Sequence, residues 1–337
     1  MDISKLKTTM INLSYDYEYI ELCVDYAKKL ENNNVPIIFD VNHLCKLIGI
    51  SQFEFFKIYS ALKYQYSISS IEKKSGGIRK LNIPSENLKY IQRWILDNIL
   101  YNISCCDNVT GFIPSKSTVD NARVYVNKEC IVGLDLENFF PTIHFGRVQG
   151  MFQRLGYTKH LSIILANLCT YKGELPQGSP ASPYIANLVC RKMDYRIVKL
   201  CKKIEANYTR YADDITISGN KGIENYICTI NKIIKSEGFK SNKKKERVLF
   251  QYHSQKVTGI IVNKKLSPPK EMKKYLRQNI YYINKYGLKS HLKKINCYEK
   301  SNFKEHLYGL AYYIKMIDKE VGISFLKKLD KIEWQVW

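Results

Sequence analysis

Two adjacent acidic residues, Asp213 and Asp214, interrupt a segment that otherwise has the pattern of β-structure, residues 208–218. Like charges in mostly apolar surroundings are unfavourable, because burial and mutual repulsion both disfavour ionised carboxylates. Neighbouring side chains of a regular strand point to opposite faces, so both carboxylates can serve one site only where the chain turns. We therefore expect two strands joined by a tight turn after Tyr211. An exposed Asp-Asp turn without a function is the competing interpretation.

A third carboxylate, Asp135, follows the apolar run of residues 131–134, which has the profile of a buried strand. A carboxylate at a strand end, beside a second strand that carries two more, is the arrangement that two-metal phosphoryl transfer requires. A bound divalent cation removes the cost of gathering these charges. Three carboxylates roughly balance two Mg²⁺ ions, and substrate phosphates supply the remaining negative charge.

Hydrophobic periodicity predicts the other elements. Helices are expected over residues 15–31, 85–100, 146–171, 183–205 and 223–237, and a further strand is expected over 256–262. Strands at 68–73 and 78–83 are expected to form a hairpin, because Gly76 and Gly77 between them can adopt the backbone angles of a tight turn.

Two short helices are expected within residues 41–61, on either side of Gly49. The second begins at Ser51 with Glu54 three residues later, which is the pattern of a capping box. A helix-turn-helix that binds DNA is the weaker interpretation, since helix pairs joined at a glycine are common. A transcription factor of this kind would leave the rest of the chain unexplained.

Pro268-Pro269 is the clearest boundary in the sequence. Beyond it the pattern is helical, with further helices expected over 303–318 and 320–333. Strands mixed with helices and then helices alone predict an α+β fold with a C-terminal helical subdomain.

Basic residues are in large excess. Lysine and arginine total 53 against 31 acidic residues, which gives a net charge of +22. This excess favours a polyanionic partner such as nucleic acid. The alternative is a basic drift of a lysine-rich composition.

Three features concern the compartment. The sequence has no run of eighteen apolar residues, and its first five residues lack the apolar core of a signal peptide. The ten cysteines include no C-x-x-C pair, so we expect neither a zinc site nor a disulfide framework. We therefore expect a cytoplasmic protein without a membrane association.

Three short motifs occur in order along the chain: Asp-Leu-Glu-Asn-Phe-Phe at residues 135–140, Leu-Pro-Gln-Gly-Ser-Pro at 175–180, and Tyr-Ala-Asp-Asp at 211–214. In order and spacing they resemble the successive palm motifs of reverse transcriptases. The resemblance extends over about 79–262. Several motifs in the right order are far more specific than any one of them.

The resemblance implies a right-hand polymerase. Its parts would be a helical N-terminal region at 1–62, fingers at 63–130, a palm with interleaved finger helices at 131–265, and an α-helical thumb at 266–337. Asp135 and Asp213 would hold both Mg²⁺ ions, and Asp214 would be a weaker ligand or an electrostatic partner. Leu136 would contribute its backbone carbonyl.

The resemblance also implies nucleotide contacts. Phe140, five residues after Asp135, would be a steric gate that clashes with a ribose 2′-hydroxyl, so the enzyme would use dNTPs. Packing in the core is the alternative role of this ring. Gln177 and Gly178 would lie against the incoming nucleotide and the template, where glycine permits a close approach. A turn that leads into a helix is compatible with the same residues.

Three basic residues are implied to contact the triphosphate. Arg79 and Lys80 would clamp it from the fingers hairpin, the arginine through bidentate contacts. Alone, a basic hairpin is usually only solvated. Lys245 would protonate the leaving pyrophosphate. It belongs to a run of three lysines, so this assignment can shift by one residue.

Val257-Thr258-Gly259 matches a motif typical of bacterial retron reverse transcriptases. A second retron motif, Asn-Ala-x-x-His, is present in part: residues 121–122 are Asn-Ala, and Tyr125 stands at the histidine position. The resemblance implies a structured noncoding RNA as template, priming from the 2′-hydroxyl of an internal guanosine, and a branched RNA–DNA product. It also implies a role in anti-phage defence with an effector protein.

A basic helical surface beyond residue 269 would hold the RNA by its shape and backbone. The residues expected on it are Lys270, Lys273, Lys274, Arg277, Lys289 and Lys293. A solvated helix face is the alternative.

Rival functions stay open. The chain could be a group II intron-like reverse transcriptase or an RNA-dependent RNA polymerase, although Phe140 argues against RNA synthesis. It could also be a catalytically idle scaffold that binds RNA, although three costly acids argue for a working site.

Overall fold

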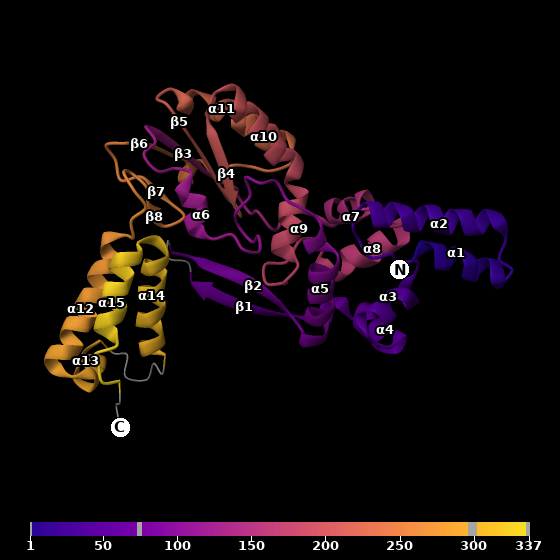
Figure 1. Ribbon diagram of the computed structural model, residues 1–337, viewed down its shortest axis with the longest axis horizontal. Helices are drawn as coiled ribbons and strands as arrows, with labels where there is room; N and C mark the ends of the chain where they lie inside the picture. Colours follow the sequence, from indigo (N-terminus) through magenta and orange to yellow (C-terminus); the bar gives the residue numbers. More distant parts are fainter. Residues whose placement is uncertain (1, 73–75, 296–301, 335–337) are drawn as a thin grey trace. The chain divides into compact units, whose positions relative to one another are not determined.

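The computed structural model describes residues 2–72, 76–295 and 302–334. The fold is α+β, as predicted, and the chain divides into two compact units that alternate along the sequence (Figure 1). The first unit comprises Met1–Ile113, Leu136–Ile197 and Ile230–Asn242. The second unit comprises Pro114–Asp135, Val198–Thr229 and Lys243–Trp337.

The first unit begins with four helices, α1 (Ile3–Asn12), α2 (Tyr17–Asn32), α3 (Val41–Ile48) and α4 (Gln52–Ser60). The predicted capping box is present: Ser51 accepts a hydrogen bond from the backbone of Glu54, whose carboxylate accepts from the backbone of Ser51. Gly49 ends α3 at a φ of 83°, where glycine carries no steric penalty. The predicted pair of helices is therefore confirmed.

The predicted hairpin is also present, in the first unit. Strand β1 (Tyr66–Glu72) pairs antiparallel with β2 (Ile78–Pro84), and Gly76 and Gly77 have positive φ angles. Lys73, at the end of the first predicted strand, lies outside the described residues. Helix α5 (Glu86–Asn98) follows, with Ser85 accepting a hydrogen bond from the Leu88 amide at its start.

Three predicted helices are each interrupted in the structure. Residues 146–171 form α7 (Phe145–Arg154) and α8 (Lys159–Cys169), and residues 183–205 form α9 (Ser182–Val189) and α10 (Arg191–Lys203). Residues 223–237 begin as the 3-10 turn η3 (Ile223–Tyr226) before α11 (Ile227–Ser236). Between α7 and α8, Gly156 has a φ of 108° and Thr158 caps the start of α8. The spacing of apolar residues does not reveal this interruption, because it continues through both helices.

The second unit contains a four-stranded antiparallel sheet in the order β4-β5-β3-β6. Its strands are β3 (Cys130–Asp135), β4 (Asn207–Tyr211), β5 (Asp214–Gly219) and β6 (Arg247–Phe250). Every residue of β3 is buried, as the apolar run predicted. Strand β6 and the short helix α6 (Thr118–Arg123) are elements that the sequence pattern did not reveal.

The strand expected over 256–262 is a small hairpin instead. Strands β7 (Lys256–Val257) and β8 (Ile260–Ile261) pair antiparallel on either side of Thr258 and Gly259. Both turn residues have positive φ, 44° and 86°, which a continuous strand does not allow.

The C-terminal helices of the second unit are α12 (Lys270–Tyr286), α13 (Leu288–Lys294), α14 (Phe303–Ile317) and α15 (Lys319–Leu329). Their inward apolar faces form one core that includes Leu276, Ile280, Leu307, Ile314 and Phe325. Helices α14 and α15 approach closely where Gly322 lies against the backbone of Lys315. Nowhere in the described ranges is there a helix of the length and apolarity that crossing a membrane demands.

Replacing Gly322 with alanine should lower the free energy of unfolding by about 1–3 kcal/mol, because the added Cβ would overlap the Cα atom of Lys315. Gly309→Ala is the matched control: it lies in α14, where an added Cβ meets nothing within 4 Å. It should raise stability by roughly 0.5–1 kcal/mol through helix propensity. Urea unfolding followed by circular dichroism measures both. Similar effects of the two substitutions would contradict the close approach of α14 and α15.

Candidate active site

Sheet register brings two of the three aspartates face to face. Asp135, the last residue of β3, pairs directly with Asp214, the first residue of β5. Both strands are central in the sheet, and Asp135 is 8% exposed. The aspartates therefore lie at the same end of two neighbouring strands of one sheet, although 78 residues separate them in the sequence.

The predicted tight turn joins β4 to β5. Tyr211 pairs with Asp214, which leaves a connection of two residues, Ala212 and Asp213. Ala212 has a φ of 57°, a left-handed conformation that costs a residue with a Cβ about 1–2 kcal/mol. The fully buried guanidinium of Arg210 donates a hydrogen bond to the Ala212 carbonyl at 3.0 Å. This contact holds the turn that places Asp213 beside Asp214.

The electrostatics of this edge are unfavourable to negative charge. Burial, and then the neighbouring charge of Asp213, raise the pKa of Asp214 to about 6, and Asp135 adds to the effect. Arg247 and Lys245 act in the opposite direction. The site therefore holds less positive charge than its carboxylates need when all of them are ionised.

Arg247 was not anticipated from the sequence. It lies on β6 opposite Gly133 of β3, and a Cβ added to Gly133 would come within 3.0 Å of the Arg247 Nε atom. Glycine at this strand position therefore leaves room for the guanidinium to cross β3. The charge of Arg247 lowers the pKa of Asp214.

Lys245 makes a direct contact with the site. It lies in the 3-10 turn η4 (Lys243–Lys245), and its Nζ donates a hydrogen bond to Asp135 Oδ2 at 2.8 Å. This bond is the main reason that the pKa of Lys245 is raised. Of the three consecutive lysines, Lys245, the one predicted to act at the site, is thus the one that contacts Asp135.

The three aspartates suit a divalent cation chemically, because hard carboxylate oxygens are its preferred ligands and because Lys245 and Arg247 only partly offset the effect of burial and of the neighbouring aspartates on Asp214. Within the described residues, no three His, Cys, Asp or Glu side chains gather closely enough to hold a metal ion together. Leu136, whose carbonyl was the fourth expected ligand, is buried and forms a β-bridge with Ser241.

Apart from Lys245, which belongs to the second unit, the predicted nucleotide-binding residues lie in the first unit. The backbone N–H of Asn82, on β2, donates a hydrogen bond to the backbone carbonyl of Gln177 at 2.8 Å. Gly178 has a φ of 141°, and a Cβ there would overlap the Asn82 carbonyl oxygen, so another residue would push the two segments apart. Arg79 and Lys80 are exposed on the same strand β2, three and two residues before Asn82. The structure thus places Gln177 and Gly178 against the strand that carries Arg79 and Lys80.

Phe140 is half-buried in an aromatic cluster of the first unit. Its ring centroid lies 5.3 Å from that of Phe139 and 6.5 Å from that of Phe112. Packing and a gating role are both compatible with a ring held in this way.

A buried hydrogen-bond network in the second unit surrounds Tyr125. Its hydroxyl donates to the Thr216 carbonyl at 2.7 Å and lies 2.7 Å from Thr209 Oγ1. Thr209 donates to Asn121 Oδ1 at 2.6 Å. The Asn121 amide in turn donates to the hydroxyl of Thr258 at 3.4 Å. The network therefore connects the two retron-like motifs with the strands that carry Asp213 and Asp214.

The predicted RNA-binding turn is firmly anchored. Val257 is buried in a core with Tyr125 and Ile131, and the Thr258 hydroxyl donates to the Thr118 carbonyl at 3.0 Å. Gly259 follows at a φ of 86°. Any contact of this turn with RNA would therefore come from its backbone rather than from the Val257 side chain.

The basic residues predicted to hold RNA lie on α12 and α13. They are exposed except for half-buried Lys273, and they comprise Lys270, Lys273, Lys274, Arg277, Lys289 and Lys293. Exposed tyrosines accompany them: the Lys285 ammonium lies 5.6 Å from the ring centroid of Tyr281 and 5.2 Å from that of Tyr286. Cations beside aromatic faces suit single-stranded nucleic acid. The helical spacing of these tyrosines was the available sequence signal.

Comparison with known proteins decides the family. The sequence profile of the family Reverse transcriptase (RNA-dependent DNA polymerase) matches residues 71–262, more than half of the chain. The chain is also 33% identical over 311 residues to Retron Ec86 reverse transcriptase from Escherichia coli, covering 90% of this chain and 93% of that protein. The chain belongs to the retron reverse transcriptases. It is therefore an RNA-directed DNA polymerase.

This retron reverse transcriptase is 30% identical over 300 residues to Retron Mx162 reverse transcriptase from Myxococcus xanthus, covering 78% of this chain and 60% of that protein. Among solved structures, apo telomerase from Candida tropicalis aligns at a TM-score of 0.49 and 12% identity, over 80% of this chain and 58% of that chain.

Replacing Asp214 with asparagine should stabilise the metal-free reverse transcriptase. The folded-state pKa of about 6 lies above the ordinary value of an aspartate, so the ionised carboxyl destabilises the fold above pH 6. We expect the free energy of unfolding at pH 8 to rise by about 1–3 kcal/mol. The gain should shrink as the pH falls through 6 and vanish below 4. Urea titrations in EDTA at several pH values measure it, with exposed Asp97→Asn as the control. A gain that does not depend on pH would contradict the assignment.

Replacing Tyr125 with phenylalanine should lower the free energy of unfolding by about 1–3 kcal/mol, because a buried network loses its hydroxyl. Tyr252→Phe removes a hydroxyl from a ring that is 80% exposed and should have no effect. Thermal unfolding of both variants measures the difference. Equal melting temperatures would show that the network contributes little.

Proposed function

We propose that this retron reverse transcriptase makes branched RNA–DNA, known as msDNA. It would copy a structured noncoding RNA and begin from the 2′-hydroxyl of an internal guanosine. We further propose that the product acts in anti-phage defence with an effector protein. The similarity to retron reverse transcriptases over 90% of the chain supports this assignment. The observation that carries the chemistry is the paired register of Asp135 and Asp214 on adjacent strands, with Asp213 in the turn beside them.

In the proposed reaction, the priming hydroxyl oxygen attacks the α-phosphorus of a dNTP. A phosphodiester bond forms, the bond between the α-phosphorus and the bridging oxygen breaks, and pyrophosphate leaves. Asp135, Asp213, Asp214 and the carbonyl of Leu136 would hold two Mg²⁺ ions. When bound, these ions would favour deprotonation of the attacking hydroxyl and neutralise charge on the leaving group.

The protein's own residues would position the reactants. Lys245 has its ammonium on Asp135 and is the proposed proton donor to pyrophosphate. Arg79 and Lys80 would hold the triphosphate, and Gln177 and Gly178 would lie against the base pair that is being formed. Phe140 would exclude a ribose 2′-hydroxyl.

Nucleic-acid binding is proposed to extend over the thumb, residues 266–337. The exposed basic residues and tyrosines of α12 and α13 support this assignment, because they offer both charge and aromatic faces. The turn Val257-Thr258-Gly259 is the proposed second contact. The remaining proposed boundaries are an N-terminal region to residue 62, fingers to 130 and a palm to 265.

The double substitution Asp213→Asn and Asp214→Asn should abolish DNA synthesis and preserve RNA binding, since the basic residues of α12 and α13 are unchanged. Sequencing of nucleic acid that co-purifies with each protein measures both properties. Wild type should carry a short DNA joined to a discrete RNA, and the variant should carry the same RNA without DNA. Asp25→Asn with Asp97→Asn removes the same charge elsewhere and should behave as wild type.

Two results would contradict the proposal. The same RNA without DNA in wild type would indicate a binding scaffold. DNA copied from many unrelated RNAs would indicate another kind of bacterial reverse transcriptase, such as a group II intron-like enzyme.

A further inference from the structure

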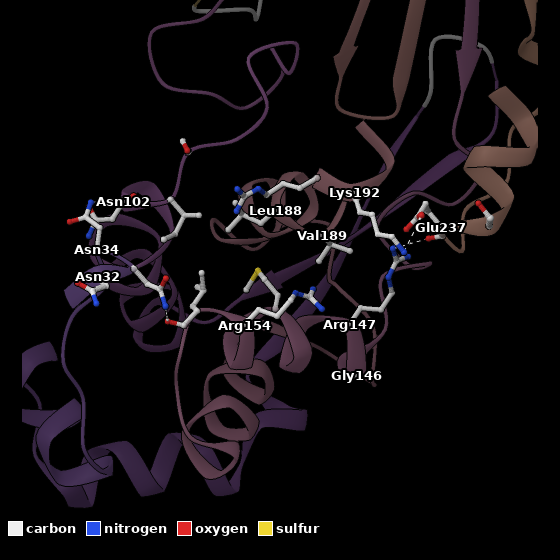
Figure 2. A pocket seen from close by; sticks show the side chains of 17 residues that line it. Asn32, Asn34, Asn102, Gly146, Arg147, Arg154, Leu188, Val189, Lys192 and Glu237 are labelled. Atoms are coloured by element: carbon white, nitrogen blue, oxygen red, sulfur yellow. Dashed lines mark hydrogen bonds and ion pairs between the residues drawn. The ribbon is translucent and has the colours of Figure 1, made fainter. Parts of the chain in front are cut away.

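A cavity of about 840 Å³ lies within the first unit, outside the segments that carry the aspartates. Figure 2 shows its two sides. Asparagines 32, 34 and 102 lie at one end, and the basic side chains of Arg147 and Lys192 lie at the other, with Arg154 between them. These residues come from the end of α2, from η2 (Leu100–Asn102), from α7 and from α10. Together with α9 and α11, which also supply lining residues, these segments form one hollow.

The lining is strongly basic. It includes Arg147, Arg154, Arg191 and Lys192 against Glu237. Three of the ten arginines of the sequence thus line this cavity, in a chain whose basic residues are mostly lysine. Arginine differs from lysine by the planar fork of donors that matches phosphate oxygens in bidentate contacts. The use of arginine here therefore favours a phosphate-bearing ligand.

Most of this charge is not neutralised. Glu237 accepts contacts from Arg196 Nη1 at 2.6 Å and from Lys192 Nζ at 3.4 Å. Within the described ranges, neither Arg154 nor Arg191 forms an ion pair. Both side chains belong to exposed residues on the cavity wall, so their charges are available to a ligand.

Arg147 adds an unused donor. Its guanidinium stacks on the Phe239 ring at 4.3 Å, and its Nη2 donates to the Glu237 carbonyl at 3.0 Å. Its Nη1 is buried and has no hydrogen-bond partner among the described residues. Burial lowers the pKa of Arg147, and the nearby charge of Arg154 lowers it further. A buried donor without an acceptor is costly, and an anionic oxygen in the cavity would supply the acceptor.

We infer that this cavity binds the sugar-phosphate backbone of an RNA strand, as a contact separate from the thumb. The arginines would hold phosphate oxygens. The asparagine amides, which can donate and accept, would contact ribose hydroxyls or further phosphates. The inference rests on the proposed binding of a structured RNA. It is tested with a defined RNA probe, so it can fail while msDNA synthesis holds.

The test compares two double variants. The cavity variant carries Arg154→Gln and Arg191→Gln together, and the control carries Arg93→Gln and Lys232→Gln together. Both double variants remove two positive charges from exposed residues of the first unit, but Arg93 and Lys232 do not line the cavity. The probe is a fluorescent RNA hairpin with single-stranded flanks, and its anisotropy is measured over a series of KCl concentrations.

The cavity variant should bind the hairpin roughly tenfold more weakly at physiological salt. Its slope of log K against log salt should be shallower by about 1.4, which corresponds to two lost phosphate contacts on a single strand. The control should change much less. If the cavity variant melts below the control, Arg191→Gln alone repeats the measurement with half the expected slope change.

Three outcomes would overturn the inference. Equal weakening in both variants would mean that only overall charge matters. Unchanged RNA binding, with calorimetric binding of inorganic triphosphate lost in the cavity variant, would assign the cavity to free polyphosphate. If RNA binding is unchanged and the cavity variant instead loses binding of a polyglutamate peptide, the cavity would be assigned to an acidic protein segment.

Discussion

The structure depends on three acidic side chains that are held close together, and partly away from solvent, at the ends of two central strands. Asp135 and Asp214 are paired in register on two central strands, and Asp213 lies in the turn next to them. Burial and mutual repulsion make the ionised forms costly, as the raised pKa of Asp214 indicates. Lys245 and Arg247 offset part of this cost. The left-handed conformation of Ala212, whose carbonyl accepts a hydrogen bond from Arg210, maintains the turn that holds Asp213 next to Asp214.

The same sheet is tied by hydrogen bonds to the two retron-like motifs. The hydroxyls of Tyr125, Thr209 and Thr258 and the amide of Asn121 form one buried polar chain. Such networks are stable when every member is satisfied, and they fix the relative position of the segments that they join. Tyr125, which departs from the usual motif histidine, is therefore part of the framework of the strands on either side of the Asp213-Asp214 turn. Its phenol, just after the end of α6, contacts both β4 and β5.

Local signals in the sequence predicted much of this framework. The apolar run before Asp135 predicted a fully buried strand, and the cost of adjacent aspartates predicted the tight turn after Tyr211. The capping box at Ser51 and the glycines of the β1–β2 hairpin were likewise sufficient for their elements. Periodicity failed at Gly156, where a left-handed residue and a new cap divide an apolar pattern that continues through the break.

Other features depend on convergence in space and could not be predicted from local pattern. Strand β6 has four residues after a run of lysines, and Arg247 matters because Gly133 on the neighbouring strand leaves it room. The basic cavity combines residues from segments more than two hundred positions apart. Pairwise contacts of this kind follow from the tertiary fold.

Strand register has a consequence for how chains of this kind can change in length. A single-residue insertion within β3 would turn every following side chain to the opposite face, including that of Asp135, and so separate it from Asp214. The stretch between β3 and β4 is under no such constraint, because it enters and leaves the sheet at the strand ends. Lineages can therefore lengthen or shorten the 71 residues between Asp135 and Asn207 while both strands keep their length to the residue.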